Sequence, residues 1–426
     1  MKIIDIALIG GGGRGKAYTD YALQHPEKFK VTALAEPCPE KRNCIKKLHN
    51  IPDNCCFSDW KELLNREKTA DIAMICTQDD MHFAPAVEAI KKGYNLLLEK
   101  PIAPTPIECE KISQLASYYK SKVVVCHVLR YTPFYRYIKD FIDNGKLGRI
   151  INIVHIEGVG NTHQSHSYVR GNWRNSKTSA PMILTKSCHD IDLLQWLIGK
   201  KCIQINSYGS LSYFNKQHAP DDAPDYCMDG CVHKDDCFYY SPLVYDESQW
   251  AGKYFRGIVA NKFNPTDEEV NNALRRGPYG RCIFKCDNNV VDHQIVNMQF
   301  EDDIDVSFTM SAFNKGGRKT IIMGTGGELT ADMDNCSITF YNFATCETEI
   351  LMKPDNNFDD TITGGHGGGD EGLMSDLYDY FANDIQSKSI SDIDISCYNH
   401  LLAFAAEKAR VENRIIDIEE YRKMQQ

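Results

Sequence analysis

The chain of 426 residues is long enough for two domains with buried cores, and its composition is that of an ordinary globular protein. A formal net charge of −10, without a stripe of lysine and arginine, argues against nucleic acid as a partner. No apolar stretch approaches the length that spans a bilayer. The 17 cysteines, several of them in strand-like runs, are typical of reduced core thiols. We therefore expect a cytoplasmic protein that binds neither nucleic acid nor membrane.

The first part of the chain alternates apolar runs with segments of helical periodicity. The predicted strands cover 3–9, 30–35, 71–76, 94–98 and 122–128. The predicted helices begin at Arg14 and Glu40 or cover 59–66, 83–92 and 106–119. This alternation is typical of a parallel, doubly wound α/β sheet. Residues 1–128 are thus expected to form a Rossmann-type dinucleotide-binding domain.

The second part, residues 129–426, has strand-like segments that follow one another with few helices between them. These segments are 150–158, 203–211, 290–300, 304–312, 318–323 and 336–351. They predict an α+β domain built on a large, mainly antiparallel, open-faced sheet. Residues 212–289 show little periodicity and are expected to form an inserted subdomain. A long helix is expected from Cys397 to Asn413.

A glycine-rich turn follows the first predicted strand. Its G-x-G-x-x-G spacing lets bare backbone approach a pyrophosphate at a helix N-terminus. The predicted cofactor-binding residues of this turn are Gly10, Gly12, Gly13, Arg14 and Gly15. Glu36 ends the second predicted strand, about 20 residues further on, where a dinucleotide fold places its ribose-binding acid. A carboxylate there repels a 2′-phosphate, so NAD is favoured over NADP.

A lysine stands at the end of a later strand of the same sheet, in Glu99-Lys100-Pro101. Ligands of such sheets bind at the carboxyl ends of the strands. The ammonium of Lys100 can therefore reach a substrate held beside the cofactor. Together with the glycine turn, this position indicates nicotinamide-dependent redox chemistry.

In this order and spacing, five motifs resemble those of the Gfo/Idh/MocA family, the glucose-fructose oxidoreductase and inositol dehydrogenase group. They are the glycine turn, Ala35-Glu36, Thr77-Gln78-Asp79-Asp80-Met81-His82, Glu99-Lys100-Pro101, and Lys186-Ser187-Cys188-His189-Asp190-Ile191-Asp192. The resemblance implies reversible oxidation of a hydroxyl on a sugar, sugar derivative or cyclitol with bound NAD(P). It also implies a homodimer or homotetramer, and it adds Thr77, His82, Glu99 and Lys100 to the cofactor-binding set.

The resemblance makes His189 the catalytic base and Lys100 the group that stabilises the alkoxide or relays the proton. Imidazole suits this part because it titrates near neutral pH. Many family members carry an aspartate four residues before the histidine, whereas this chain has Thr185 there, followed by Lys186. We therefore predict a catalytic set of Lys100, Lys186 and His189.

Three further segments are expected to line the substrate pocket. They lie after the last Rossmann strand, at 166–174, and in a glycine-rich loop at 364–370 that precedes a helix. Imidazoles, guanidiniums and tryptophan suit the hydroxyls and the apolar face of a sugar. With one residue of the histidine motif, the predicted substrate-binding residues are Arg130, Tyr131, His166, Arg170, Trp173, Asp190 and His366.

Five cysteines lie in the predicted insertion, as Cys227-x3-Cys231-x5-Cys237 and Cys282-x3-Cys286. A segment without an apolar core of its own gains stability from thiolate coordination of zinc. We expect ligands from Cys227, Cys231 and Cys237, with Cys286 or Cys282 as the fourth. The alternative is that these are scattered thiols of a cysteine-rich chain.

Three functions compete at this stage. The first is an NAD-dependent dehydrogenase acting on a sugar or cyclitol. The second is an NAD-dependent glycoside hydrolase that works through transient oxidation at C3 and elimination, as some members of the resembled family do. The third is a non-catalytic nucleotide-sensing regulator, against which the presence of both Lys100 and His189 argues.

Overall fold

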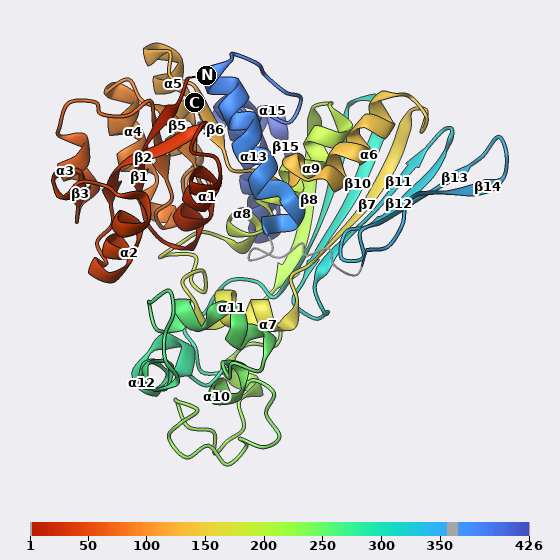
Figure 1. Ribbon diagram of the computed structural model, residues 1–426. Helices are drawn as coiled ribbons and strands as arrows, with labels where there is room; N and C mark the ends of the chain where they lie inside the picture. The colour runs from red at the N-terminus through yellow and green to blue at the C-terminus, as the bar shows by residue number, and fades with distance from the viewer. Residues whose placement is uncertain (1, 356–364, 426) are drawn as a thin grey trace.

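The computed structural model describes residues 2–355 and 365–425 (Figure 1). The glycine-rich loop predicted at 364–370 therefore begins at a position outside the described residues. No helix in the described part of the chain is long and apolar enough to cross a membrane.

The first sheet is parallel throughout, with strand order β3-β2-β1-β4-β5-β6. Its strands are β1 (Ile4–Ile9), β2 (Phe29–Ala35), β3 (Cys56–Phe57), β4 (Ile72–Ile75), β5 (Asn95–Leu98) and β6 (Val123–Val125). The intervening helices are α1 (Gly13–Gln24), α2 (Pro39–His49), α3 (Trp60–Leu64), α4 (Phe83–Lys91) and α5 (Pro106–Tyr119). The predicted Rossmann fold is confirmed, and its strand order reverses between β1 and β4, where such sheets bind ligands.

The second sheet is mainly antiparallel, with the order β14-β13-β12-β11-β7-β10-β9-β8-β15 among the described residues; its only parallel pair there is β7 with β10. The strands are β7 (Ile150–Gly158), β8 (Cys202–Ser210), β9 (His293–Phe300), β10 (Ile304–Ser311), β11 (Gly317–Gly324), β12 (Gly327–Asp332), β13 (Ser337–Asn342), β14 (Glu347–Met352) and β15 (Ile416–Asp417). Helices α6 (Pro133–Asp143), α9 (Cys188–Ile198) and α14 (Ile393–Glu412) lie on one side of it, whereas the other side is open in Figure 1. The predicted α+β domain is confirmed.

Several elements differ from the sequence prediction. The single strand expected at 336–351 is two strands, because a turn capped by Asn342 separates β13 from β14. The helix expected after the glycine-rich loop is α13 (Gly365–Ala382), which already begins within that loop, and α15 (Ile418–Gln425) was not predicted. Helix α13 packs its apolar residues, among them Leu373 and Leu377, against the first sheet. The domain boundary at 128/129 stays a prediction. Helix α13 lies far beyond this boundary in the chain, yet it completes the core of the first sheet.

The inserted subdomain has its own helices, α10 (Ser241–Val244), α11 (Trp250–Val259) and α12 (Asp267–Arg276). Thr266 and Glu269 form a reciprocal capping box at the start of α12. Two apolar clusters lie within the subdomain, one around Phe214 and Phe284 and one around Tyr245 and Leu274. The expectation that this segment has no core of its own is therefore wrong.

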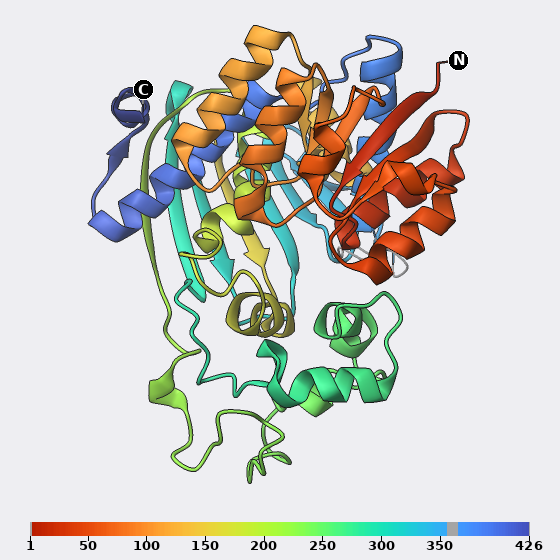
Figure 2. The ribbon, with the colours of Figure 1, turned by 90° about the vertical axis from the view of Figure 1, so that its left-hand side faces the viewer.

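The inserted subdomain also touches α2 of the first domain (Figure 2). The ammonium of Lys41 donates to Asn261 Oδ1 at 2.6 Å, and Lys262 pairs with Glu40 at 3.3 Å. Phe263 packs against the apolar cluster of the first domain. The subdomain thus links the sheet domain to the start of α2, the helix that follows Glu36 in the chain.

Candidate active site

A cavity of about 620 Å³ lies where the carboxyl ends of the first sheet meet the second sheet and α11. The catalytic residues predicted from the sequence, Lys100, Lys186 and His189, all line it. So do Arg14, Thr77, Glu99, Trp173 and His366 from the other predicted sets. The structure therefore brings together side chains from both domains that are distant in sequence.

The glycine turn has the shape that a dinucleotide requires. Gly10 has a φ of +95°, and a Cβ there would lie 2.5 Å from the carbonyl oxygen of Cys76. At Gly12 and Gly13, by contrast, nothing lies within 4 Å of an added Cβ, so the backbone is open to an incoming group. The residues present therefore fit a bound pyrophosphate.

Glu36 is held beside this turn. Its carboxylate accepts hydrogen bonds from the backbone N–H groups of Gly11 at 2.7 Å and Cys38 at 2.8 Å. These bonds fix the acid at the end of β2, the position at which a dinucleotide ribose is bound in this fold.

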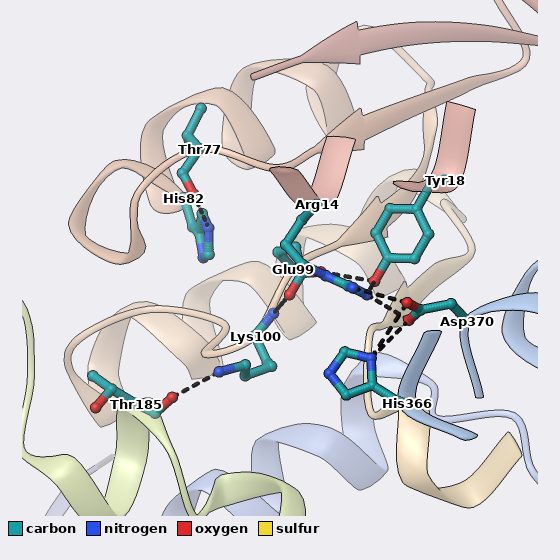
Figure 3. Close-up of polar contacts among 9 residues, drawn as sticks. All are labelled: Arg14, Tyr18, Thr77, His82, Glu99, Lys100, Thr185, His366 and Asp370. Atoms are coloured by element: carbon teal, nitrogen blue, oxygen red, sulfur yellow. Dashed lines mark hydrogen bonds and ion pairs between the residues drawn. The ribbon is translucent and has the colours of Figure 1, made fainter. Parts of the chain in front are cut away.

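Arg14 and Glu99, two of the predicted cofactor residues, belong to a buried charged network (Figure 3). The guanidinium of Arg14 donates to Glu99 Oε1 at 2.8 Å and to both carboxylate oxygens of Asp370. Tyr18 donates to Glu99 at 2.7 Å, and His366 Nδ1 lies 3.2 Å from Asp370. Although burial opposes ionisation, Arg14 holds the pKa of both carboxyls below their usual range. The network fixes His366 of α13 against α1 and β5.

His82 and Thr77 shape the loop after β4. The buried imidazole of His82 contacts the carbonyl oxygen of Thr77 at 3.1 Å (Figure 3). Its other ring nitrogen lies 2.6 Å from the carbonyl oxygen of Pro101. Both of its ring nitrogens are thereby engaged with protein. Thr77 lines the cavity, whereas His82 holds the two loops together and does not line it.

Lys100 and His189 both line the cavity, and the positive charge of Lys100 acts on the imidazole of His189. The ammonium of Lys100 donates to the backbone carbonyl of Thr185 at 2.7 Å, which leaves further N–H donors for a ligand (Figure 3). None of the residues that the structure describes bonds to Nδ1 of His189. Burial, and next the positive charge of Lys100, lower the pKa of His189 well below 6.5. His189 is therefore neutral and able to accept a proton at neutral pH.

Lys186 lines the cavity and belongs to a network of buried ion pairs. Its ammonium lies 3.0 Å from Glu157 Oε1, and Arg318 bridges Glu157 and Asp190 at 2.7 Å to each. His155 Nε2 lies 3.2 Å from Asp190. Asp190 is fully buried and does not line the cavity, so its predicted contact with substrate is not supported. The contacts with Arg318 and His155 explain why Asp190 is buried, because a carboxylate in the core needs a charged or hydrogen-bonding partner.

Arg130 and Tyr131 are also buried away from the cavity. Arg130 forms a two-pronged pair with Asp192, at 2.6 and 2.7 Å. Tyr131 exchanges hydrogen bonds with Ser391. The predicted role of Arg130 and Tyr131 in substrate binding is thus not supported, since both residues are buried and neither lines the cavity.

His166 and Arg170 anchor the inserted subdomain instead of lining the cavity. The imidazole of His166 stacks on Phe255 at 3.9 Å between ring centroids, and its Nδ1 lies 2.9 Å from the hydroxyl of Tyr245. Arg170 is fully buried and donates to the backbone carbonyls of Arg281 and Tyr239. These contacts correct the prediction that both residues meet substrate.

The cavity has further residues that the predicted set does not include. His163 lines it, and burial together with Lys186 lowers the pKa of its imidazole well below 6.5. From α11 come Trp250, Tyr254 and Phe255. The spacing of Trp250 and Tyr254, four residues apart on an amphipathic helix, is a signal that could have pointed to them.

The predicted zinc ligands are not assembled. Among the described residues, which include all five cysteines, no group of three or more histidine, cysteine or acidic side chains is placed to hold a metal ion. Cys227 Sγ lies near the guanidinium of Arg170 and the carbonyl of Arg281, and Cys286 bonds to the carbonyl of Cys282. The subdomain instead contains two apolar clusters, one around Phe214 and Phe284 and one around Tyr245 and Leu274.

Comparison with known proteins agrees with this architecture. Residues 4–127 match the family described as "Oxidoreductase family, NAD-binding Rossmann fold", and residues 139–363 match its "C-terminal alpha/beta domain". The protein YteT of Bacillus subtilis (strain 168) is 26% identical over 366 residues, which are 82% of each chain. An inositol 2-dehydrogenase of Burkholderia multivorans is 24% identical over 46% of this chain and 55% of that protein.

Solved structures show the same fold. The scyllo-inositol dehydrogenase of Lactobacillus casei, in a structure with bound NAD(H) and scyllo-inositol, superimposes with a TM-score of 0.65. It is 19% identical, and the match covers 98% of this chain and all of that one. The two profile matches take in most of the sequence, and the chain belongs to the Gfo/Idh/MocA family of NAD-binding oxidoreductases.

Proposed function

We propose that the protein is an NAD-dependent oxidoreductase that oxidises or reduces a secondary hydroxyl of a sugar, sugar derivative or cyclitol. The observation that carries the proposal is that Lys100 and a neutral His189 line one cavity at the carboxyl ends of the dinucleotide-binding sheet. Relatives named as inositol dehydrogenases support the substrate class.

In this mechanism His189 accepts the hydroxyl proton of the substrate, and the ammonium of Lys100 stabilises the developing alkoxide. NAD, when bound, supplies the hydride acceptor. Lys186 holds a neighbouring substrate oxygen, with Glu157 keeping its ammonium in place at 3.0 Å. Trp173, whose Nε1 donates to Asp79 at 2.7 Å, presents a fixed ring to the substrate.

The direct test is incubation of the NAD-loaded protein with a panel of hexoses, inositols and glycosides. We expect absorbance at 340 nm to rise with at least one of them. A panel without any cofactor reduction or product would favour the non-catalytic regulator.

A second candidate, the NAD-dependent glycoside hydrolase, is favoured by one specific observation. Among the described residues, three imidazoles line the cavity, those of His163, His189 and His366, and burial lowers the pKa of each. Oxidation at C3, proton removal at C2, departure of the aglycone and addition of water need more acid and base groups than one hydride transfer does. Release of aglycone without net NADH, followed by NMR, distinguishes this function from the dehydrogenase.

The pH dependence of catalysis follows from the lowered pKa of His189. A base that must be neutral stays active until the pH falls through its pKa, so kcat/KM should remain level as the pH drops through 6.5. In Lys100→Met the acid limb should move to higher pH, because the nearby positive charge is lost. A parent profile that already falls by half at pH 6.5 would contradict this assignment.

We also propose that NAD is preferred over NADP, because the carboxylate of Glu36 repels a 2′-phosphate. Glu36→Ala should weaken NAD binding by about tenfold, since hydrogen bonds to a charged group contribute roughly 1.5 to 3 kcal/mol. NADP binding should change little or improve. Calorimetry measures both, and equal affinity of the parent protein for the two cofactors would exclude the preference.

The open face of the second sheet supports the predicted homo-oligomer. Tyr208, Ile295 and Ile156 are exposed and lie in one row across the strands, with Thr309 between the two isoleucines. We propose that this face pairs with a second copy, and that Tyr208→Lys shifts the mass measured by light scattering toward the monomer. An unchanged mass would place the interface elsewhere. The cytoplasmic location stays a prediction.

A further inference from the structure

The inserted subdomain brings aromatic side chains into the cavity that holds Lys100 and His189. Trp250, Tyr254 and Phe255 of α11 line this cavity. On α11, Ala251, Phe255 and Val259 face the apolar cluster of the subdomain and are buried. Trp250 stands at the first turn of the helix, beside this buried stripe, and keeps 43% of its surface exposed.

The three rings are held in a fixed arrangement before any ligand arrives. The centroid of Trp250 lies 5.2 Å from that of Tyr254 and 5.4 Å from that of Phe255, both at steep angles. Phe255 in turn stacks on the buried His166. Because edge contacts with its neighbours hold the indole, it offers an apolar surface at little cost in side-chain entropy.

A second pair of aromatic rings lines the same cavity. It consists of Tyr168 and Trp173, with centroids 6.0 Å apart, and Trp173 is tied to Asp79. The ring of His163 links this pair to α11, because its centroid lies 6.0 Å from those of Tyr168 and Phe255. In the proposed reaction, the sugar ring whose hydroxyl is oxidised must lie against Lys100 and His189. Predicted cofactor residues and the predicted catalytic residues share the lining of this cavity, and α11 adds three aromatic rings to it, with the Tyr254 hydroxyl and the Trp250 N–H as their polar groups.

We propose that α11 forms a subsite for a second ring of the substrate, so that the substrate is a glycoside whose reacting sugar carries a further sugar or an aromatic ring. This inference rests on the proposed function and deepens it. Trp250 stacks on the second ring, while Lys100, Lys186 and His189 hold the first. A free monosaccharide or cyclitol would leave Trp250 without a contact.

The test compares methyl with 4-nitrophenyl glycosides of glucose, galactose and N-acetylgalactosamine, which differ only in the second ring. Their binding to the NAD-loaded protein is measured by calorimetry. For the sugar that binds, we expect the 4-nitrophenyl glycoside to bind about three- to tenfold tighter, the range of one aromatic contact. Trp250→Ala should reduce this ratio to less than about twofold and leave the methyl glycoside unchanged.

Two control variants accompany the test. Phe238→Ala removes an exposed ring of the same subdomain, one that does not line the cavity, and should keep the ratio of the parent protein. Trp250→Phe should keep most of the ratio, and unchanged NAD affinity shows that each variant is folded. The subsite would be overturned if the ratio of 4-nitrophenyl to methyl glycoside affinity were the same in Trp250→Ala as in the parent protein. A ratio near one in the parent protein would overturn it as well. If neither glycoside binds and no panel compound is oxidised, the proposed function itself falls, and the subsite with it.

Discussion

Turnover should fall by at least about 10²-fold when Lys100 is replaced by Met or His189 by Asn, the loss typical of a positioned acid or base. Lys100 Nζ has a backbone carbonyl as its protein acceptor, and His189 Nδ1 has no partner among the described residues. Neither substitution breaks an ion pair that the structure records. Thermal stability should therefore stay close to that of the parent protein.

Lys315→Met is the matched control, since it removes a cavity-lining ammonium that pairs with Asp334 on the surface. It should retain turnover within a few-fold. Steady-state kinetics with the compound found in the substrate panel give the comparison. If Lys100→Met and His189→Asn both turn over within a few-fold of the parent, these residues have no part in proton transfer.

The largest loss of stability is expected for Arg130→Leu. Arg130 and Asp192 are both buried and share two hydrogen bonds, and Asn399 donates to the same carboxylate at 2.7 Å. Removal of the guanidinium leaves a buried carboxylate without its charge partner, which costs about 3 to 5 kcal/mol. Urea denaturation should show this decrease in the free energy of unfolding.

Arg276→Leu serves as the comparison, because Arg276 pairs with Asp229 on the surface and its side chain is 71% exposed. An exposed pair of this kind contributes less than about 1 kcal/mol. The two variants thus separate a structural arginine from a surface one. If Arg130→Leu were as stable as the parent but bound substrate weakly, the interpretation of Arg130 as a core residue would be wrong.

The parts of the fold that could be predicted from the sequence are those with regular apolar patterns. The five longer strands of the first sheet appear as apolar runs, and the place of Lys100 at the cavity follows because strand ends in such a sheet meet at one edge. Neither Lys186 nor His189 stands at a strand end, and both were predicted through the family resemblance. The start of helix α13 differs from the prediction because it lies among the glycines, where His366, Gly367 and Gly368 have positive φ values. Helix α6 carries a recognisable start, Thr132 followed by Pro133, which the strand-dominated pattern obscured.

The substrate-binding residues were harder to predict, and the segment 163–173 shows why. Residues 164–170 form a π-helical stretch, so side chains do not repeat at the usual 3.6-residue interval. His163 and Trp173 consequently reach the cavity, while His166 and Arg170 point into the inserted subdomain. For Arg130 the partner is 62 positions away, and no local pattern distinguishes a buried ion pair from a ligand contact.

The inserted subdomain contacts the surroundings of the candidate site at two places. One is at α2, next to Glu36, where Lys41 meets Asn261 and Phe263 packs on the first domain. The other is at the cavity, where Trp250, Tyr254 and Phe255 of α11 and Lys100 share one lining. A single insertion thus braces the two domains against each other on both sides of the candidate site.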